Sequence, residues 1–316
     1  MRTRHAATFA LAILVGTAIL PTAAVARIHS APTVRIRDAR CTNTDATPPG
    51  PGDPGADPGP LGKVGRFKFG TLWITVTRGS RHLTTLIVFP REARDLLLPV
   101  LVFAHGWDNN PSGYLPVLEG WASAGIVVVA PTAPGMAKGL PLIDEHAAND
   151  EQLADLPVVL TKVLRWRLPV RLDPREVAYA GHSDGALAVA AMALDPTYSD
   201  HRACAYFLLA PGVNGRDGSH IDANVAPVFV ADSYRDEYGL WPSAKHLYAI
   251  ASRPKALVGI GRNETHLSPW VDRNGFTLAL WQSTVDFYAW SLSRRPADRG
   301  RVLRDLAIPG FGVTID

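Results

Sequence analysis

The sequence has few cysteines, only Cys41 and Cys204 among its 316 residues. A structural zinc site needs about four closely spaced Cys or His ligands, so two cysteines this far apart predict no metal centre. They suffice for one disulfide if the protein is exported to an oxidising compartment. The apolar run 203–209 fits an inert buried thiol at Cys204 equally well, so the pairing stays open.

Long runs of charge are also missing. Lys, Arg, Asp and Glu make up 19% of the residues, the formal net charge is only +3, and no five consecutive residues are Lys or Arg. This balance gives no electrostatic reason to expect a nucleic-acid partner. The hydrophobic content of 47% predicts a folded globular core, and a chain of 316 residues can form one large α/β domain.

The apolar stretch near the N-terminus, residues 6–20, is shorter than the about 20 residues that a membrane-spanning helix needs. It follows the basic residues 1–5 and precedes Ala24-Val25-Ala26, a small-x-small cleavage site. This order predicts a signal peptide, residues 1–26, and a protein that is secreted or held in the periplasm or cell envelope without stable membrane insertion. An uncleaved anchor is the alternative, because signal segments and short anchors overlap in length.

Residues 47–62 are mostly Pro, Gly and Asp, which cannot bury enough apolar surface to offset chain entropy. We therefore predict a flexible leader over residues 27–65 and one folded domain over residues 66–316. Within that domain, residues 67–77 alternate between apolar and polar as a half-buried strand does, and residues 82–90 are its expected hairpin partner.

Short continuous apolar runs then recur, each typical of a strand that is covered on both faces of a parallel sheet. They are residues 98–103, 126–130, 177–180, 206–209, 228–231 and 256–260. Segments of helical character separate them, at residues 114–124, 145–167, 184–194, 241–251 and 276–293. This alternation predicts an α/β fold with a doubly wound, mostly parallel sheet, helices on both faces and antiparallel N-terminal strands. The stretch 211–226 is too short for a large lid, which favours an open site.

One motif carries the chemistry. Residues 181–185 read Gly-His-Ser-Asp-Gly, between a predicted strand and an Ala-rich predicted helix. Glycines on both sides of a serine permit the sharp strand-to-helix turn of a nucleophile elbow, which lifts the hydroxyl above the carboxyl edge of the sheet. Ser183 is therefore the candidate nucleophile, with a Gly-Ser turn without catalysis as the alternative.

A serine hydrolase also needs two donors for the negative charge of its tetrahedral intermediate. The amide of Asp184 is the expected first donor. Ala104-His105-Gly106-Trp107 follow the strand 98–103, and the amide of Trp107 is the expected second donor. The Trp107 ring is a candidate substrate contact, with a packing role as the alternative.

The base and its orienting acid are expected downstream of the serine, in the order acid and then histidine. His266 lies in a loop just after the strand 256–260, whereas the other downstream histidines lie in a predicted helix or in polar loops. For the acid we prefer Asp236, in the loop after the strand 228–231. Asp232, at the end of that strand, is the close alternative, and Asp217 is a distant third.

The 181–185 motif, His105-Gly106-Trp107, the helix from Tyr114 and Thr265-His266 together resemble the α/β-hydrolase superfamily. The nearest group is the bacterial cutinase-like, dienelactone-hydrolase-like and platelet-activating-factor-acetylhydrolase-like esterases, over residues 67–292. The resemblance implies ester hydrolysis through an acyl-enzyme, no cofactor, and oxyanion donors at the positions matching Trp107 and Asp184. Two features depart from it. Asp184 stands where the family usually has Met, Phe, Gln or Leu, and residues 233–237 lack the usual short Asp-containing turn.

The sequence thus predicts an esterase or lipase that acts on small-molecule, lipid or polyester esters. Trp107, Tyr234, Trp241 and Trp270 are expected at the catalytic edge of the sheet, where they are candidates for an aromatic substrate wall and equally for ordinary packing residues. Two rival hypotheses use the same residues. One is a catalytically weakened hydrolase-fold binding protein, and the other is an acyltransferase with the same triad.

Overall fold

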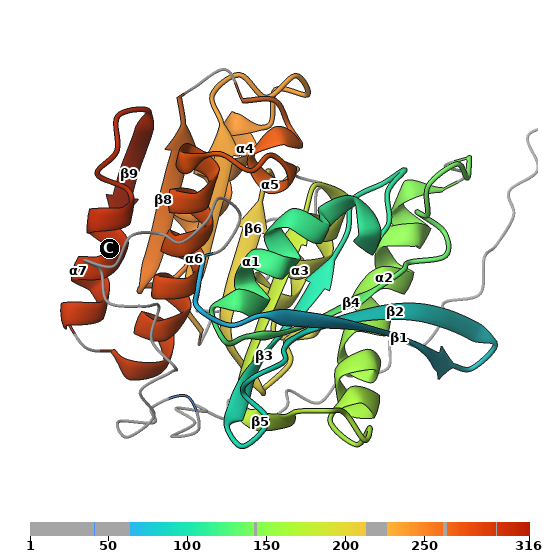
Figure 1. Ribbon diagram of the computed structural model, residues 1–316. Coiled ribbons are helices and arrows are strands. Elements are labelled where there is room, and N and C mark those ends of the chain that lie inside the picture. Colours follow the sequence, from blue (N-terminus) through green and yellow to red (C-terminus); the bar gives the residue numbers. More distant parts are fainter. Residues whose placement is uncertain (1–40, 42–63, 142–143, 213–225, 262–263, 295) are drawn as a thin grey trace, which may run out of the picture. The chain divides into compact units, whose positions relative to one another are not determined.

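A computed structural model describes residue 41 and residues 64–141, 144–212, 226–261, 264–294 and 296–316 (Figure 1). These residues all belong to one unit, Arg37–Asp316. The predicted signal peptide, most of the predicted leader and Asp217 lie outside the described residues, as does most of the stretch judged too short for a lid.

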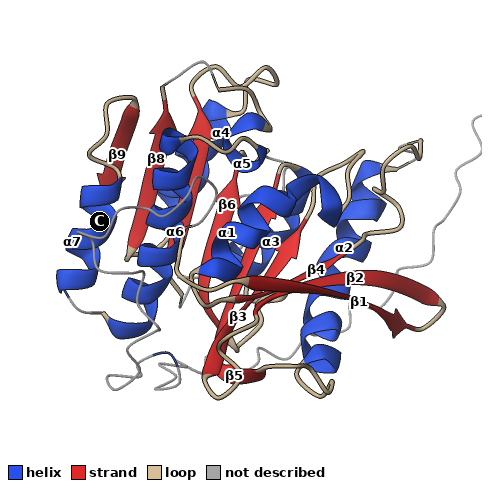
Figure 2. Cartoon of the chain, in the orientation of Figure 1, coloured by secondary structure: helices blue, strands red, loops and turns tan. Residues whose placement is uncertain are grey.

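The strands form one nine-stranded sheet in the order β1-β2-β4-β3-β5-β6-β7-β8-β9 (Figure 2). The strands from β4 to β8 in this order are parallel, whereas β1, β2 and β9 at the two edges pair antiparallel with their neighbours. The predicted fold class is confirmed. The strands are β1 (Phe69–Arg78), β2 (Arg81–Pro90), β3 (Leu97–Ala104), β4 (Val127–Pro131), β5 (Arg171–His182), β6 (Ala203–Leu209), β7 (Val228–Ser233), β8 (Lys255–Ile260) and β9 (Phe311–Ile315).

Burial explains the two kinds of strand pattern. Every residue of β4, β6, β7 and β8 is buried, because helices cover both faces of the central sheet and leave neither face open to solvent. In contrast, exposed residues alternate with more buried ones along the second half of β1, at the edge of the sheet. Continuous and alternating apolar patterns in the sequence therefore mark central and edge strands.

Helices pack on both faces of the sheet (Figure 1). Buried side chains of α2 (Glu145–Val163), α3 (Asp184–Leu194) and α4 (Trp241–Ile250) join one core. Those of α1 (Leu115–Ser123), α5 (Ser268–Val271), α6 (Gly275–Ser293) and α7 (Pro296–Asp305) join the other. Because β3, β5, β7 and β8 are parallel, the loops that follow them emerge at one edge, which we call the catalytic edge.

Several elements differ from the prediction. The helix predicted over residues 145–167 ends at Val163, where the Arg165 and Trp166 amides bond carbonyls only three residues back. These bonds tighten the chain into a turn, and Pro169 disfavours helical backbone at the residue before it. The short α5, together with α7 and β9, was not predicted.

The amino ends of the strands carry a covalent link. Cys41 forms a disulfide with Cys204, the second residue of β6, with their Cα atoms 5.4 Å apart. The predicted domain begins at residue 66. Just before it, the amides of Val64 and Gly65 donate to the Ser123 hydroxyl over 3.2 and 2.9 Å. No helix in the described ranges combines the length and hydropathy of a bilayer-spanning segment.

Candidate active site

Ser183 stands at the turn from β5 into α3, at the catalytic edge. Its backbone lies at φ 56° and ψ −123°, in a region that residues with a side chain seldom occupy. Such strain persists only where the surroundings enforce it. One such constraint is the Ser183 amide, which donates to the Leu209 carbonyl at the end of β6 over 3.0 Å.

Close backbone contacts explain the two glycines of the motif. A Cβ on Gly181 would overlap the carbonyl oxygen of Gly185, and a Cβ on Gly185 would overlap the carbonyl oxygen of Ala104. The strand end, the start of α3 and the end of β3 can meet this tightly only when both positions are glycine. The sequence motif is therefore a consequence of packing around Ser183.

His266, from the loop after β8, pairs with Asp236, from the loop after β7. The Asp236 Oδ2 lies 2.5 Å from His266 Nδ1, and both side chains are buried. Burial acts to raise the pKa of Asp236, but the hydrogen bond and charge of His266 bring the pKa below its usual value. The ionised Asp236 accepts the Nδ1 proton, which leaves Nε2 of the neutral ring as the basic nitrogen.

Backbone contacts join the two loops that carry this pair. The His266 amide donates to Glu237 Oε2 over 2.7 Å, and the Ser233 hydroxyl donates to the Glu264 carbonyl over 2.7 Å. Glu237 lies directly after the predicted acid Asp236, but nothing in the sequence indicated that it would hold the histidine backbone.

Asp232, the alternative acid, has different surroundings. It is 1% exposed and accepts a hydrogen bond from the Ser233 amide over 2.7 Å. Burial, followed by the charge of Asp236, raises the pKa of Asp232, which favours its protonated form. The structure brings Asp236, and not Asp232, to the ring of His266.

The loop after β3 runs directly beside Ser183. A Cβ on Gly106 would lie 2.9 Å from the Ser183 Cβ. The Trp107 amide, the expected second oxyanion donor, donates to Asp184 Oδ2 over 3.2 Å. Burial, followed by the charge of Glu145, raises the pKa of Asp184 to about 6. Asp184 was expected to supply one oxyanion donor through its backbone amide. Its side chain instead accepts the hydrogen bond of the other expected donor, the Trp107 amide.

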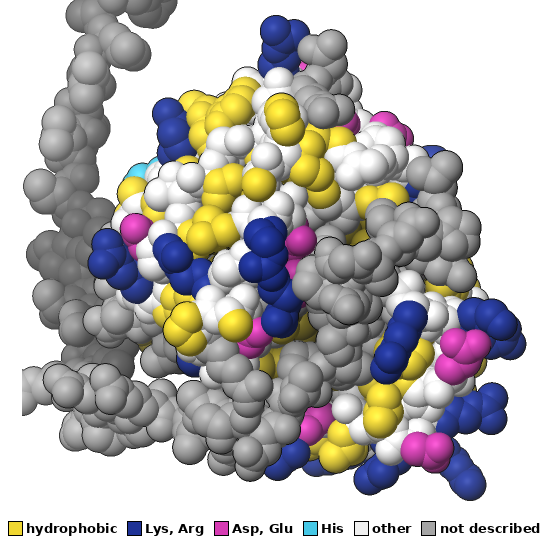
Figure 3. Space-filling model, turned by 60° about the vertical axis from the view of Figure 1, so that its left-hand side comes forward, with side chains coloured by type: hydrophobic (Ala, Val, Ile, Leu, Met, Phe, Trp, Pro, Cys, Tyr) yellow, Lys and Arg dark blue, Asp and Glu magenta, His cyan; other side chains and the backbone are white. Residues whose placement is uncertain are grey.

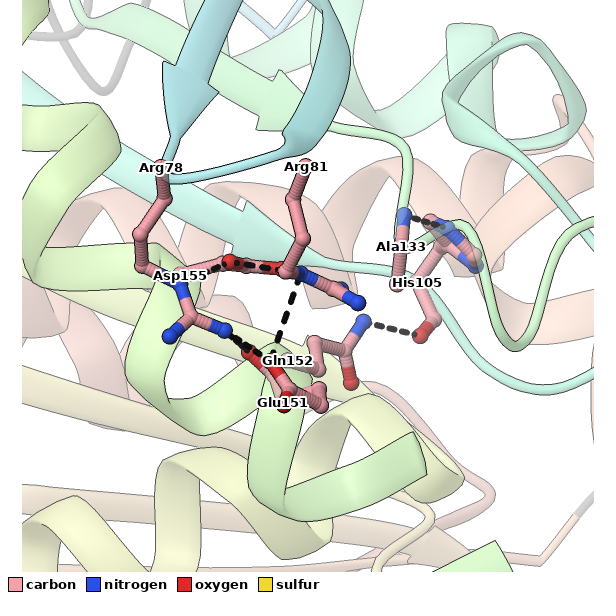
Figure 4. Close-up of polar contacts among 7 residues, drawn as sticks. All are labelled: Arg78, Arg81, His105, Ala133, Glu151, Gln152 and Asp155. Carbon is pink, nitrogen blue, oxygen red and sulfur yellow. Dashed lines mark hydrogen bonds and ion pairs between the residues drawn. The ribbon is translucent and has the colours of Figure 1, made fainter. Parts of the chain in front are cut away.

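The same loop is held from behind by His105, whose ring is buried (Figure 4). Its Nδ1 donates to the Gly106 carbonyl over 2.8 Å, and its Nε2 accepts from the Ala133 amide over 2.9 Å. Gln152 of α2 donates to the His105 carbonyl over 3.0 Å. Burial lowers the pKa of His105 to about 4, so the ring stays neutral and keeps both bonds near neutral pH.

The helix that supplies Gln152 is tied to the β1–β2 hairpin. Asp155 of α2 lies between Arg78 and Arg81 and bonds each of them at 2.6 Å (Figure 4). Glu151 pairs with both arginines from the more exposed side. The Asp155 carboxylate is almost fully buried, so these charges fix α2 against the sheet edge.

The predicted aromatic wall is only partly assembled. Trp107 and Tyr234 are each 47% exposed, but the Tyr234 ring packs edge-on against Trp241, with centroids 4.6 Å apart. Trp270 is 1% exposed and belongs to the core, so of its two expected roles it has the packing one. Tyr238, which was not predicted, is 69% exposed and lies edge-on to His266 at 4.8 Å.

Apolar side chains gather on part of the molecular surface. In the face drawn in Figure 3, hydrophobic side chains gather in the upper part, toward the catalytic edge, with Lys and Arg scattered around them. Among the described residues, no group of three or more His, Cys, Asp and Glu side chains gathers as metal ligands.

Three buried polar residues near the site were not singled out from the sequence, namely Tyr114, His182 and Gln152. Gln152 carries the clearest signal, because it interrupts the buried side of an amphipathic helix. His182 fills a position of the Gly-x-Ser-x-Gly pattern that allows any residue. Tyr114 has the appearance of an ordinary aromatic at a helix start.

Similarity to a known protein family covers the part of the chain that carries the first half of this site. A chlorophyllase family model matches residues 63–231, more than half of the 316-residue chain. The matched range contains Trp107, Ser183 and Asp184, and it ends before Asp236 and His266. No curated protein sequence matches the chain.

Proposed function

Since the chain belongs to the chlorophyllase family, within the α/β-hydrolase superfamily of serine esterases, we propose that it is an ester hydrolase and that Ser183, His266 and Asp236 are its catalytic triad. The observation that carries this proposal is the 2.5 Å hydrogen bond between Asp236 and His266, at the sheet edge where Ser183 is presented. The reaction would be hydrolysis of a carboxylic ester through an acyl-enzyme.

In the proposed mechanism His266 Nε2 takes the Ser183 proton as Oγ attacks the ester carbonyl. The ionised Asp236 stabilises the imidazolium that forms. His266 then gives the proton to the leaving alkoxide, and the acyl group stays on Ser183. A water molecule, deprotonated by His266, attacks the acyl-enzyme, and the proton returns to Ser183 as the acid is released.

The proposed oxyanion donors are the amides of Trp107 and Asp184. Two such donors are worth about 3 kcal/mol each in comparable enzymes. Because the Trp107 amide donates to the Asp184 carboxylate in the free protein, that carboxylate has to move before the oxyanion can bind. The proposed reaction therefore includes displacement of the Asp184 side chain.

We propose esters with apolar groups, of small molecules, lipids or polyesters, as the substrates. The half-exposed Trp107 ring and the exposed Tyr238 ring, which lies against His266, support this choice. Export is proposed as well. The signal-like N-terminus and the Cys41–Cys204 disulfide both favour an oxidising compartment, and the intact mass of protein recovered outside the cytoplasm tests cleavage after Ala26.

Covalent labelling tests the nucleophile. A fluorophosphonate probe should label the native protein, and Ser183→Ala should abolish both labelling and hydrolysis of p-nitrophenyl esters. Ser80→Ala, in the exposed turn between β1 and β2, is the matched control and should label normally. Equal labelling of native protein and Ser183→Ala would refute the assignment.

A second candidate function is a hydrolase-fold binding protein without turnover. The observation in its favour is the Asp184 carboxylate at the Trp107 amide, because a negative charge beside an oxyanion opposes its formation. Ester binding without labelling or hydrolysis would select this function over the esterase.

A further inference from the structure

A chain of buried hydrogen bonds joins the oxyanion loop to the proposed catalytic histidine. The Gly106 amide donates to the Tyr114 hydroxyl, with N and Oη 3.2 Å apart. The Tyr114 Oη lies 2.8 Å from His182 Nδ1, and His182 Nε2 lies 3.0 Å from the carbonyl oxygen of His266. Tyr114 is 1% exposed and His182 is 2% exposed, so water does not compete for these bonds.

The contacts allow only one arrangement of protons. A carbonyl oxygen can only accept, so His182 Nε2 carries the proton and donates it to His266. Nδ1 of the neutral ring then accepts from the Tyr114 hydroxyl, whose oxygen still accepts from Gly106. Burial, followed by the charge of His266, lowers the pKa of His182 to about 3, which keeps its ring neutral.

Each end of this series of hydrogen bonds is a backbone group of a loop that the proposed reaction needs, the oxyanion loop at one end and the His266 loop at the other. Gly106 precedes the Trp107 amide, one proposed oxyanion donor. At the other end, the His182 bond adds a third anchor to His266, whose amide is held by Glu237 and whose ring is held by Asp236. His182 itself is the last residue of β5, directly before the nucleophile.

We propose that His182 and Tyr114 are positioning residues, which fix the oxyanion loop and the His266 loop relative to each other and to Ser183. The inference rests on the proposed triad. Neither side chain touches the reacting atoms in this role. A displacement of about 1 Å between reacting groups costs a factor on the order of 100 in rate, so the effect belongs in kcat and not in substrate affinity.

Three variants test the role on p-nitrophenyl esters. Tyr114→Phe keeps the ring and removes the hydroxyl bonds to Gly106 and His182, and we expect kcat to fall about 10-fold with KM changed less than about threefold. His182→Leu removes the donor to His266, and we expect a loss of roughly 100-fold. His182→Gln, whose amide can donate in place of Nε2, should recover most of that loss.

Tyr179→Phe is the matched control. It removes the hydroxyl of a different buried tyrosine, which lies in β5 and bonds Asp200 over 2.5 Å. Tyr179 belongs to the core on the other face of the sheet. We expect it to lower the melting temperature without changing kcat. If the His182 and Tyr114 variants keep native kcat, or if His182→Gln is no better than His182→Leu, the positioning role is wrong and the triad still stands.

Imidazole ¹⁵N spectra supply a readout that needs no activity. They should show His182 as the Nε2–H tautomer, without titration between about pH 5 and pH 8. An active native enzyme in which His182 carries its proton on Nδ1, or titrates in this range, contradicts the positioning role alone. A native enzyme that hydrolyses no ester and reacts with no fluorophosphonate contradicts the triad and the positioning role together.

Discussion

Two aspartates follow β7, and only one of them has the surroundings of a triad acid. Asp236 is ionised and bonds the His266 ring, whereas burial favours the protonated form of Asp232. We expect Asp236→Asn to lower kcat by roughly 10⁴-fold, because the ring then loses its tautomer and its counter-charge. Asp232→Asn should lower kcat less than about 10-fold. Steady-state kinetics of the two isosteric variants decide the matter, and the opposite ranking would move the acid to Asp232.

The sequence could not separate these two aspartates, because both lie within reach of the same strand end. The choice depends on the turn that follows β7. The Asp236 amide donates to the Ser233 carbonyl over 3.3 Å, and Asp236 Oδ1 accepts from the Tyr238 amide over 2.8 Å. These local bonds turn the carboxylate toward the next loop, which no spacing rule specifies. Ser183 was easier to predict, since its glycines are required by backbone contacts that the motif itself encodes.

Asp184 should give kcat/KM a pH dependence that a variant without the carboxylate lacks. Its pKa is raised to about 6, so it is neutral well below pH 6 and ionised well above it. The ionised form binds the Trp107 amide more strongly and repels an oxyanion. Replacing it with leucine, which keeps the backbone amide, should raise kcat/KM up to about 10-fold near pH 8 and leave kcat/KM nearly unchanged near pH 5.

The informative quantity is the ratio of kcat/KM between Asp184→Leu and native enzyme at each pH. Effects on kcat/KM that are common to both enzymes cancel in this ratio. Asp184→Asn, which keeps the shape and loses the charge, should give an intermediate ratio. A ratio that stays constant from about pH 5 to pH 8 would show that the carboxylate does not compete for the oxyanion donor.

At the scale of elements, the Asp155 contacts should hold α2 in place more than they serve catalysis. Asp155→Asn removes the buried charge that faces Arg78 and Arg81, and we expect the free energy of unfolding to fall by about 2 kcal/mol. Glu151→Gln changes a more exposed partner of the same arginines and should cost less than about 1 kcal/mol. Urea denaturation of both variants measures the difference, and equal losses would mean that burial does not strengthen the Asp155 pairs.

Elements that fill the middle of the sheet were predictable, because burial on both faces demands an unbroken apolar run. β7 and β8 are examples, and their predicted ranges differ from the observed ones by at most two residues. β9 is a different case. Four of its five residues are only partly buried and Thr314 is exposed, and they become a strand because β8 offers hydrogen-bond partners for their backbone groups. An edge strand of this kind depends on a tertiary neighbour that local pattern does not reveal.

At the scale of the whole molecule, the α/β-hydrolase superfamily predicted from the sequence is confirmed, while the nearer likeness to cutinase-like esterases stays a prediction. The reason is that the fold is encoded by repeated strand and helix patterns along the chain. Substrate choice, in the function proposed above, depends instead on a few loop side chains, such as Tyr238 and Trp107. The pairing of Cys41 with Cys204 was open for a similar reason, since it joins residues 163 positions apart that only the folded chain brings together.

This disulfide should stabilise the molecule without affecting its chemistry. Closing a loop of this length restricts the unfolded chain, and we expect Cys41→Ala combined with Cys204→Ala to lower the free energy of unfolding by about 4 kcal/mol. Because Cys204 lies near the amino end of β6, opposite the catalytic edge, kcat at a temperature where the variant is folded should stay within about twofold of native. Denaturation with and without a reductant supplies the control. A reductant should bring the native protein to the stability of the variant and leave the variant unchanged, whereas a reductant-insensitive native protein would assign the stability to packing around Cys204.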